Sequence, residues 1–566
     1  MIIDARSISH NTNIDTDVCI VGGGVAGMAV ARELIDQPFR VCVLESGGLE
    51  PDSDTQALCR GDNVGLPYFQ LDEARPRCLG GSAYNWFMPI DGTRVGIQLR
   101  PLDPIDFEER DWVPNSGWPF TRADLDPFYK RAQSFCGLGP FTYRGDDWAD
   151  PETRPCLPLL NGRVQTVIFQ LGARDTFIGR HRPQISQAEN ITTYLHATVT
   201  EIETGSAAQA VSRLRVACTA DKGAWVTAKV VILALGGIET PRLLLLSNRT
   251  QRDGLGNGHD LVGRFFMEHL HLLSGTYVSS KLDTEKLGRL YAFHAVNNTL
   301  LYGRLALSDE VLRSERLLNY SVAIPRAFWP LTVRAAAQKL LRTSQLLGTS
   351  LRKGELRECQ RHLRDLVPLI FNDAVPAIGR KIAGLAKRRL IEKLTRSQKI
   401  EVFLLNHMTE QAPNPESRVT LSDELDALGQ RRVRLDWRLT AADIRSLIRA
   451  QQILDEELRR AGLGRLEIEL KDEAPPPDLM GGWHHMGTTR MHRDPRKGVV
   501  NEHGQVHGVH NLFIAGPSVF PTGGYANPTL TIVALAIRLA DHVKARMNDL
   551  PDRVAQLLHA AGREPA

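Results

Sequence analysis

The sequence predicts an α/β protein (α+β overall) with two domains, and three observations support this prediction. The chain has 566 residues, and a single hydrophobic core rarely organises a chain of this length. Near the N-terminus a strand, a glycine-rich turn, a helix and a second strand follow one another, which is the order of a parallel sheet unit. From 271 to 475 the pattern changes to further strands and one amphipathic helix, which is typical of an antiparallel sheet with helices.

Composition narrows the class of protein. Hydrophobic residues make up 42% and charged residues 24%, as in ordinary globular proteins. The net charge of +4 gives no reason to expect a nucleic-acid partner. The 8 cysteines form no CxxC pair and no regular spacing, which indicates free thiols in a reducing compartment. We find no signal-peptide pattern and no apolar run of the ~18 residues that a membrane span needs, so we expect a cytoplasmic protein.

The first glycine-rich turn has the spacing of a dinucleotide-binding site. The segment DVCIVGGGVAGMAVARELI places Gly22, Gly24 and Gly27 between an apolar strand and a helix expected over 26–35. Glycines at this spacing let backbone N–H groups and the helix N-terminus approach a pyrophosphate. Glu45 ends the next strand, where a carboxylate accepts hydrogen bonds from a ribose. The motif alone does not distinguish NAD from FAD.

Two further segments bear on this choice. ARPRCLGGSAYNWFMPI contains Gly80, Gly81 and Ser82, which form either a loop beneath a flat ring or phosphate, or a surface turn. Strands expected over 193–203, 211–218 and 225–235 lead into a Gly-Gly pair and a helix. A terminal buried strand of this kind completes an FAD-type domain better than an NAD-type domain.

The C-terminal segment from 483 to 531 carries the candidate chemistry. It reads WHHMGTTRM, a loop, NLFIAGPSVF and then PTGGYANPTLTIVALAIRLADHV, which predicts a short strand, a turn and a helix beginning near Pro528. Proline is well placed in a first helical turn, where its missing N–H costs nothing. His484 and Asn527 are polar side chains at the two edges of this unit.

The order of these motifs resembles the glucose–methanol–choline (GMC) oxidoreductase family over nearly the whole chain. The motifs are VGGGVAGMAVARELI with Glu45, LGGS, ALGGIETPRLLLLS, VGRFFMEH, PNPESRVTLS, HHMGTTRM and GGYANPTLTIVALAIRLADHV. The resemblance implies a Rossmann-type FAD-binding domain and a second domain whose antiparallel sheet forms the substrate pocket. The family's H-x-x-G-T histidine matches His484 rather than His485, and its partner before the last helix matches Asn527.

The resemblance also implies domain boundaries. We expect 1–270 to form the first part of the FAD-binding domain, with 70–190 contributing to the junction and the pocket. The substrate-binding domain is expected over 271–475, and the second part of the FAD-binding domain over 476–566.

The resemblance assigns the FAD site to a set of glycines and polar residues drawn from these motifs. The expected contacts are Gly22, Gly24, Gly27, Glu45, Gly80, Gly81, Ser82, Asn85, Val199, Gly516, Pro528 and Thr529. Several similar enzymes carry His-Trp in the second glycine-rich loop, and in some that histidine is bonded to the flavin. This chain has Asn85-Trp86, so we expect non-covalent FAD.

Oxidation of a carbinol requires a hydride acceptor, which only a cofactor supplies, and a group that takes the O–H proton. We expect His484 to be the base and Asn527 to hold the substrate oxygen. The helix beginning at Pro528 would direct its positive N-terminal end towards the flavin.

The resemblance is greatest to pyranose oxidases and bacterial glycoside 3-oxidases, which implies oxidation of a sugar or glycoside hydroxyl, a secondary one that becomes a keto group. The alternatives are another small alcohol of secondary metabolism, or a lyase or scaffold with non-redox flavin. The electron acceptor is oxygen, a quinone or a redox protein.

Other interpretations of the same residues stay open. From spacing alone, His484 also fits a hydrogen-bonded core histidine beside Trp483. The histidines near it also suggest a metal site, but glycines between them disfavour a helical ligand face and no cysteine lies nearby, so we expect no metal. Glu268 and His269 either line the pocket or pack.

Residues 331–400 form a basic segment within the second domain. This segment holds 16 Lys/Arg and 5 Asp/Glu, a charge of +11, so the remainder of the chain carries −7. It is either a solvated helical insertion that covers the domain or mediates homo-oligomerisation, or a docking surface for an acidic redox partner or an anionic membrane.

Overall fold

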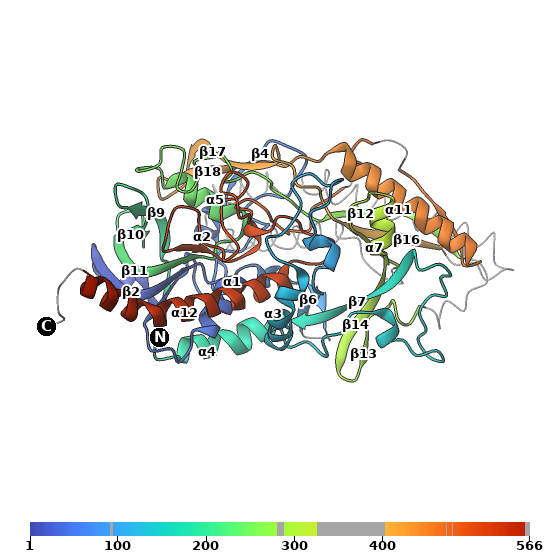
Figure 1. Ribbon diagram of the computed structural model, residues 1–566, viewed down its shortest axis with the longest axis horizontal. Helices are drawn as coiled ribbons and strands as arrows, with labels where there is room; N and C mark the ends of the chain where they lie inside the picture. The colour runs from blue at the N-terminus through green and yellow to red at the C-terminus, as the bar shows by residue number, and fades with distance from the viewer. Residues whose placement is uncertain (91–93, 280–287, 325–401, 471–472, 478, 561–566) are drawn as a thin grey trace, which may run out of the picture.

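The computed structural model describes residues 1–90, 94–279, 288–324, 402–470, 473–477 and 479–560. Two large sheets lie towards opposite ends of the long axis of the molecule (Figure 1). The predicted basic segment 331–400 lies outside the described residues. Within the described ranges, no helix is long and apolar enough to cross a membrane.

The first sheet is mainly parallel and is built from segments that span almost the entire chain. In spatial order its strands are β1 (Ile2–Asp4), β8 (Ile191–Leu195), β3 (Val41–Leu44), β2 (Thr12–Val21), β11 (Gly223–Leu233), β10 (Val211–Ala217) and β9 (Thr198–Thr204), with β20 (Leu512–Ile514) paired to β11. All pairs from β1 to β11 and the β11–β20 pair are parallel, whereas β10 and β9 pair antiparallel. This is the Rossmann-type architecture that the sequence predicts.

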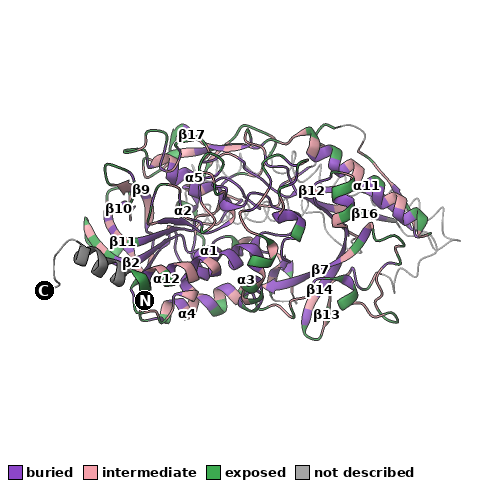
Figure 2. Cartoon of the chain, in the orientation of Figure 1, coloured by how far each residue is buried: buried purple, intermediate pink, exposed green. Residues whose placement is uncertain are grey.

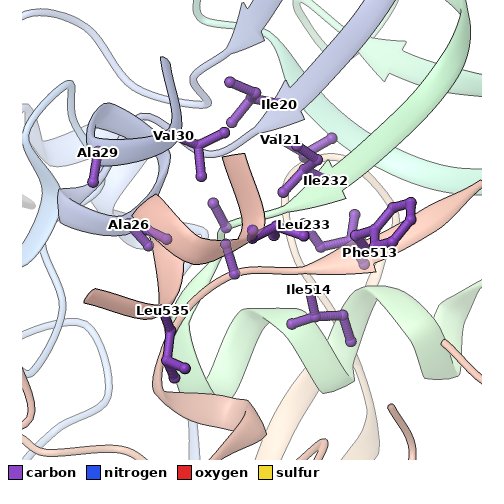
Figure 3. Packing of buried hydrophobic residues seen from close by; sticks show 14 of the residues in the cluster. Ile20, Val21, Ala26, Ala29, Val30, Ile232, Leu233, Phe513, Ile514 and Leu535 are labelled. Atoms are coloured by element: carbon purple, nitrogen blue, oxygen red, sulfur yellow. The ribbon is translucent and has the colours of Figure 1, made fainter. Parts of the chain in front are cut away.

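Helices pack against this sheet through small and branched apolar side chains. Helix α1 (Val25–Glu33) contacts α12 (Thr529–Ala560), and α12 also contacts α3 (Arg122–Phe135). Figure 3 shows Val30 of α1 and Leu535 of α12 in one buried cluster with strand residues from β2, β11 and β20. The segments before residue 270 and after 476 therefore share one core.

One predicted strand is wrong. The strand expected over 193–203 is two strands, β8 and β9, which lie far apart in the sheet order. His196 between them has φ +53°, a left-handed conformation that ends the first strand. The apolar alternation continues across this position, so the pattern does not reveal the break.

The second sheet is antiparallel throughout its described pairs. In spatial order it consists of β19 (Gly464–Glu467), β12 (Leu270–Ser279), β16 (Val402–Thr409), β15 (Tyr320–Ala323), β14 (Thr299–Leu307), β7 (Val164–Ala173), β6 (Val95–Leu99) and β5 (Met88–Pro89), with β13 (His294–Val296) beside β14. Strands β5, β6 and β7 precede residue 270, so this sheet draws on both sides of the predicted boundary at 270/271.

The two faces of the second sheet differ. Side chains such as Leu305 and Leu405 share a core with Leu447 of helix α11 (Ala441–Arg460). This helix is the predicted amphipathic one, and Figure 2 shows buried and exposed residues alternating along it. The opposite face carries polar side chains, including Tyr302 and Asn406, which line the cavity described below.

Smaller elements complete the described fold. A third sheet contains β17 (Arg418–Leu425), β18 (Arg431–Asp436) and β4 (Gly61–Asn63). The remaining helices and helical turns are α2 (Ser53–Ala57), α4 (Arg182–Gln187), α5 (Gly236–Leu246), α7 (Asp309–Ser314), η1 (Ala5–Ser7), η2 (Gly81–Asn85), η3 (Pro104–Phe107), η4 (Gly145–Asp147), η5 (Thr176–His181) and η7 (Pro517–Val519).

Candidate active site

A cavity of about 1010 Å³ is lined by residues from both large sheets. Its lining runs from the first glycine-rich turn to the polar face of the second sheet. Typical small-molecule sites occupy roughly 300–1,000 Å³. The cavity therefore has room for a large cofactor together with a substrate.

The glycine-rich turns form an open cradle at one end of the cavity. Gly22 has φ +104°, and a Cβ there would lie 2.6 Å from the carbonyl oxygen of Ala234. A Cβ on Gly24 would instead find only the Cα of Gly81 within 4 Å, at 3.9 Å. The backbone at Gly24 is thus bare towards the cavity, which suits close approach of a pyrophosphate.

Glu45 holds this turn in place from the end of β3. Its two carboxylate oxygens accept hydrogen bonds from the backbone N–H groups of Gly23 and Gly47, each at 2.8 Å. The side chain is buried and lines the cavity. Each carboxylate oxygen has a further lone pair, so Glu45 can still accept hydrogen bonds from a ribose.

Most of the sequence-predicted cofactor residues line the cavity. Those that do are Gly22, Gly24, Glu45, Gly81, Ser82, Asn85, Val199, Pro528 and Thr529. Those that do not are Gly27, Gly80 and Gly516. A Cβ on Gly27 would lie 1.9 Å from the carbonyl oxygen of Gly22, so this glycine permits α1 to pack against the turn.

Helix α12 begins at the cavity wall. Pro528, Thr529 and Ile532 line the cavity, and this end of a helix carries a partial positive charge. This partial positive charge suits an electron-rich ring that becomes more negative on reduction. The bare cradle, the carboxylate and the helix end therefore fit FAD extended across the cavity.

His484 and Asn527 lie together at the same wall of the cavity. The Nε2 atom of His484 is 3.0 Å from the side-chain nitrogen of Asn527, and both side chains are buried. The two residues come from separate segments, the turn that follows Trp483 and the loop before α12. The structure thus brings the two predicted catalytic residues within hydrogen-bond distance.

Glu268 fixes the backbone beside His484. One of its carboxylate oxygens accepts hydrogen bonds from the N–H groups of Gly482 and His484, both at 2.9 Å. Trp483 between them has φ +61°, which is strained for a bulky residue. Tyr68 donates to the other oxygen. Burial raises the pKa of Glu268 to about 7, although these hydrogen bonds oppose the rise.

His484 and Asn527 each have a further buried hydrogen-bond partner. His269 places Nδ1 2.8 Å from Nδ1 of His484, and its Nε2 is 3.1 Å from the carbonyl oxygen of Gly523. On the other side, the Gln98 amide nitrogen donates to the Asn527 side-chain oxygen at 2.8 Å. Tyr302 donates its hydroxyl to the Gln98 side-chain oxygen.

Burial favours the neutral form of the histidines of this site. Burial, with neighbouring histidines as a second cause, lowers the pKa of His484 well below its usual range. Burial also lowers the pKa of His269 to about 4 and that of His485 to about 3. A neutral imidazole has one nitrogen lone pair free to take a proton.

His485 is engaged elsewhere. Its Nε2 atom is 2.9 Å from the hydroxyl oxygen of Tyr68, which itself donates to Glu268. This contact favours His484 over its neighbour as the residue that acts with Asn527.

Sequence reasoning missed Gln98, Tyr302 and Tyr68, and it left the roles of Glu268 and His269 open. Gln98 gave one weak signal, a polar residue inside the apolar strand VGIQL, but nothing local connects it with residue 527. Among the residues that the structure describes, no group of three His, Cys, Asp or Glu side chains is arranged to hold a metal ion.

Comparisons with known proteins agree with this geometry. Residues 413–536 match the model of the GMC oxidoreductase C-terminal region. The chain is 34% identical over 587 residues to paromamine 6′-oxidase of Streptomyces fradiae, covering 95% of this chain and 92% of the relative. It is 27% identical over 605 residues to 2-methyl-1,2-propanediol dehydrogenase of Mycolicibacterium austroafricanum, covering 95% and 97%.

A solved structure of formate oxidase shares the fold, with a TM-score of 0.51 and 16% identity over 96% of this chain and 100% of that one. The full-length relatives and the matched family region lead to one conclusion, with which the lining of the cavity agrees. The chain belongs to the GMC oxidoreductase family and is an FAD-dependent enzyme that oxidises alcohol or sugar CH–OH groups.

Proposed function

We propose that this enzyme oxidises a hydroxyl group of a sugar or glycoside, with His484 and Asn527 acting directly on that hydroxyl. The observation that carries the proposal is the 3.0 Å contact between His484 Nε2 and the Asn527 amide nitrogen at the cavity wall. A substrate oxygen placed against both atoms donates its proton to one and accepts a hydrogen bond from the other.

His484 is the proton acceptor in this proposal. Its imidazole is buried and neutral, so Nε2 can take the hydroxyl proton as the carbon loses hydride. Asn527 has no basic atom, but its N–H holds the oxygen and stabilises the negative charge that develops there. FAD, when bound, supplies the hydride acceptor.

The polar face of the second sheet supports a hydroxylated substrate. Tyr302, Arg304 and Asn406 line the cavity, and all three offer hydrogen-bonding groups to a polyol. The full-length relatives are named for paromamine and for 2-methyl-1,2-propanediol, which supports a hydroxylated substrate. We propose that the reacting group is a secondary hydroxyl, which becomes a keto group.

We propose that FAD is bound without a covalent link. Asn85 stands where some family members carry a flavin-linked histidine, and its amide donates instead to the carbonyl oxygen of Glu73 at 3.3 Å. Acid precipitation of the purified protein should release all the flavin into the supernatant; yellow colour that stays in the pellet would contradict this.

We propose that the enzyme is cytoplasmic, and the seven cysteines in the described residues, all of them free thiols, support a reducing compartment. The electron acceptor in this proposal is oxygen, a quinone or a redox protein.

Anaerobic mixing of the yellow enzyme with a substrate panel tests the proposed function. The panel contains glycosides, free sugars, 1,2-diols and simple alcohols, and the flavin absorbance is followed in time. We expect the fastest bleaching with a glycoside, and the position of the new carbonyl is then determined. Fastest bleaching with simple alcohols would favour the alternative substrate class, whereas flavin that stays oxidised with every compound would contradict a redox role.

A further inference from the structure

We propose that His269 is a positioning residue that fixes which nitrogen of His484 carries the proton, so that Nε2 always meets the substrate as a base. This inference rests on the proposed function of His484. It concerns a residue that contacts neither the substrate position nor the cofactor cradle, but acts through the His484 ring.

The direction of the hydrogen bonds follows from the partner at the far end. His269 Nε2 lies 3.1 Å from the carbonyl oxygen of Gly523, and a carbonyl oxygen only accepts, so Nε2 must carry the hydrogen. A neutral imidazole has one N–H, so Nδ1 of His269 is an acceptor. The 2.8 Å contact to Nδ1 of His484 therefore requires the hydrogen to be on the His484 side.

The position of this hydrogen also determines the state of Nε2, the atom of His484 that faces the substrate. With its hydrogen on Nδ1, neutral His484 presents a bare lone pair at Nε2, where the Asn527 amide nitrogen lies at 3.0 Å. That nitrogen must then be the N–H₂ donor, and the Asn527 oxygen must accept from elsewhere. It does so from the Gln98 amide nitrogen at 2.8 Å, while Gln98 accepts from the Tyr302 hydroxyl.

All these hydrogen bonds consequently run in one direction, from Tyr302 to the carbonyl of Gly523. The participating side chains are buried: Tyr302 5%, Gln98 8%, Asn527 4%, His484 8% and His269 0% exposed. If one of these buried hydrogen bonds were reversed, two donors or two acceptors would face each other at its neighbour. The direction of each bond therefore fixes the direction of the others.

With all these hydrogen bonds reversed, the site would still bind a hydroxyl group but would not oxidise it. With the hydrogen on Nε2 of His484, the Asn527 oxygen would turn towards the ring. This pair offers one donor and one acceptor to a substrate oxygen, as before, yet neither atom takes the proton. Loss of the correct tautomer therefore lowers the rate of flavin reduction and leaves substrate affinity nearly unchanged.

Two matched substitutions separate this role from packing. In His269→Asn, the side-chain oxygen occupies the place of Nδ1 and still accepts from His484. In His269→Gln, the end group reaches the place of Nε2 and keeps the contact with the Gly523 carbonyl, but the acceptor for His484 is lost. Both variants remove the ring, so packing losses are similar.

The rate constant for anaerobic flavin reduction and the substrate dissociation constant are measured separately by rapid mixing. We expect His269→Gln to lower the rate constant about 10²-fold, the upper end of the range seen when the hydrogen-bond partner that orients a metal-binding histidine is removed. His269→Asn keeps the acceptor and should lower the rate constant at most about threefold. The dissociation constants should stay within about threefold of the wild type. Equal rate constants for the two variants, or a loss in affinity alone, would overturn the proposal.

A second measurement needs neither a variant at His269 nor a substrate. In the ¹⁵N spectrum of the histidine-labelled holoenzyme, the signal that His484→Gln removes should report Nδ1 protonated and Nε2 bare. The reverse pattern would overturn the proposal even if no substrate is found. Conversely, a wild-type flavin that no alcohol reduces would count against the proposed function while this spectrum still decides the tautomer.

Discussion

The two ends of the cavity are built in different ways. At the cofactor end, the two glycine-rich turns, together with Glu45, form the cradle from bare backbone where side chains are missing. At the catalytic end, the side chains of Gln98, His269 and Tyr302 surround the His484–Asn527 pair. A local backbone motif therefore holds the cofactor, whereas the topology of the second sheet assembles the chemistry. Substitutions at the catalytic end should therefore lower the reaction rate, whereas substitutions at the cofactor end should lower the affinity for FAD.

The largest effect is expected at His484. His484→Gln removes the base, and because general-base catalysis contributes up to about 10⁴-fold, flavin reduction should slow roughly 10³- to 10⁴-fold. The flavin content should be normal, since the cradle is untouched. His485→Gln is the matched control: its ring contacts Tyr68, so it should retain activity within about tenfold. Equal losses in both variants would contradict the assignment of the base.

Asn527→Ala should have the next largest effect. It removes one donor to the substrate oxygen, and loss of such a donor typically costs about 10²- to 10³-fold in rate. Rapid-mixing measurement of flavin reduction checks this value. A rate within a few-fold of wild type would show that another group stabilises the oxygen.

A substitution in the cofactor cradle should weaken FAD binding rather than slow the reaction of the bound flavin. Gly24→Val fills the bare side of the cradle, and we expect FAD to bind about 10²-fold more weakly, which corresponds to roughly 3 kcal/mol. Gly205→Val is the control, because a Cβ there meets nothing within 4 Å and the glycine lies in an exposed turn. Fluorescence titration of the apoprotein gives both affinities, and unchanged affinity in Gly24→Val would place the pyrophosphate elsewhere.

The smallest effect concerns stability and pH at the catalytic end. The pKa values of His269, His271 and His485 are lowered to about 4, 3 and 3, mainly by burial. These histidines bind fewer protons when folded than when unfolded, so stability should fall as the pH falls below about 6.5. Glu268 opposes this, because its raised pKa of about 7 makes the folded state bind an extra proton between about pH 4.5 and 7.

For these four groups, unfolding takes up a net two protons in this window, or about 3 kcal/mol per pH unit. Glu268→Gln removes the opposing proton and should make the fall steeper by about 1.4 kcal/mol per pH unit. Urea unfolding of the wild-type and Glu268→Gln holoenzymes at several pH values measures the difference between their two slopes. A shallower slope in the variant would contradict the raised pKa of Glu268.

The same contrast explains how much the sequence could predict. The spacing of Gly22, Gly24 and Gly27 with Glu45 is local, so it predicted the βαβ unit. The family motifs pointed to His484 and Asn527, which lie within hydrogen-bond distance in the structure. Gln98 and Tyr302 could not be predicted, because they reach the site only through the pairing of β6 and β14 with β7 between them. His196 shows the same limit for the fold, since one left-handed residue divides a pattern that looks continuous.

The role of His484 as the base is tested most directly by the rate of anaerobic flavin reduction in wild type and His484→Gln. The substrate is the best glycoside, with hydrogen or deuterium on the reacting carbon. We expect deuterium to slow flavin bleaching in the wild type, and we expect bleaching to be roughly 10³- to 10⁴-fold slower in the variant, which retains its flavin. Bleaching at the wild-type rate in His484→Gln would contradict this role.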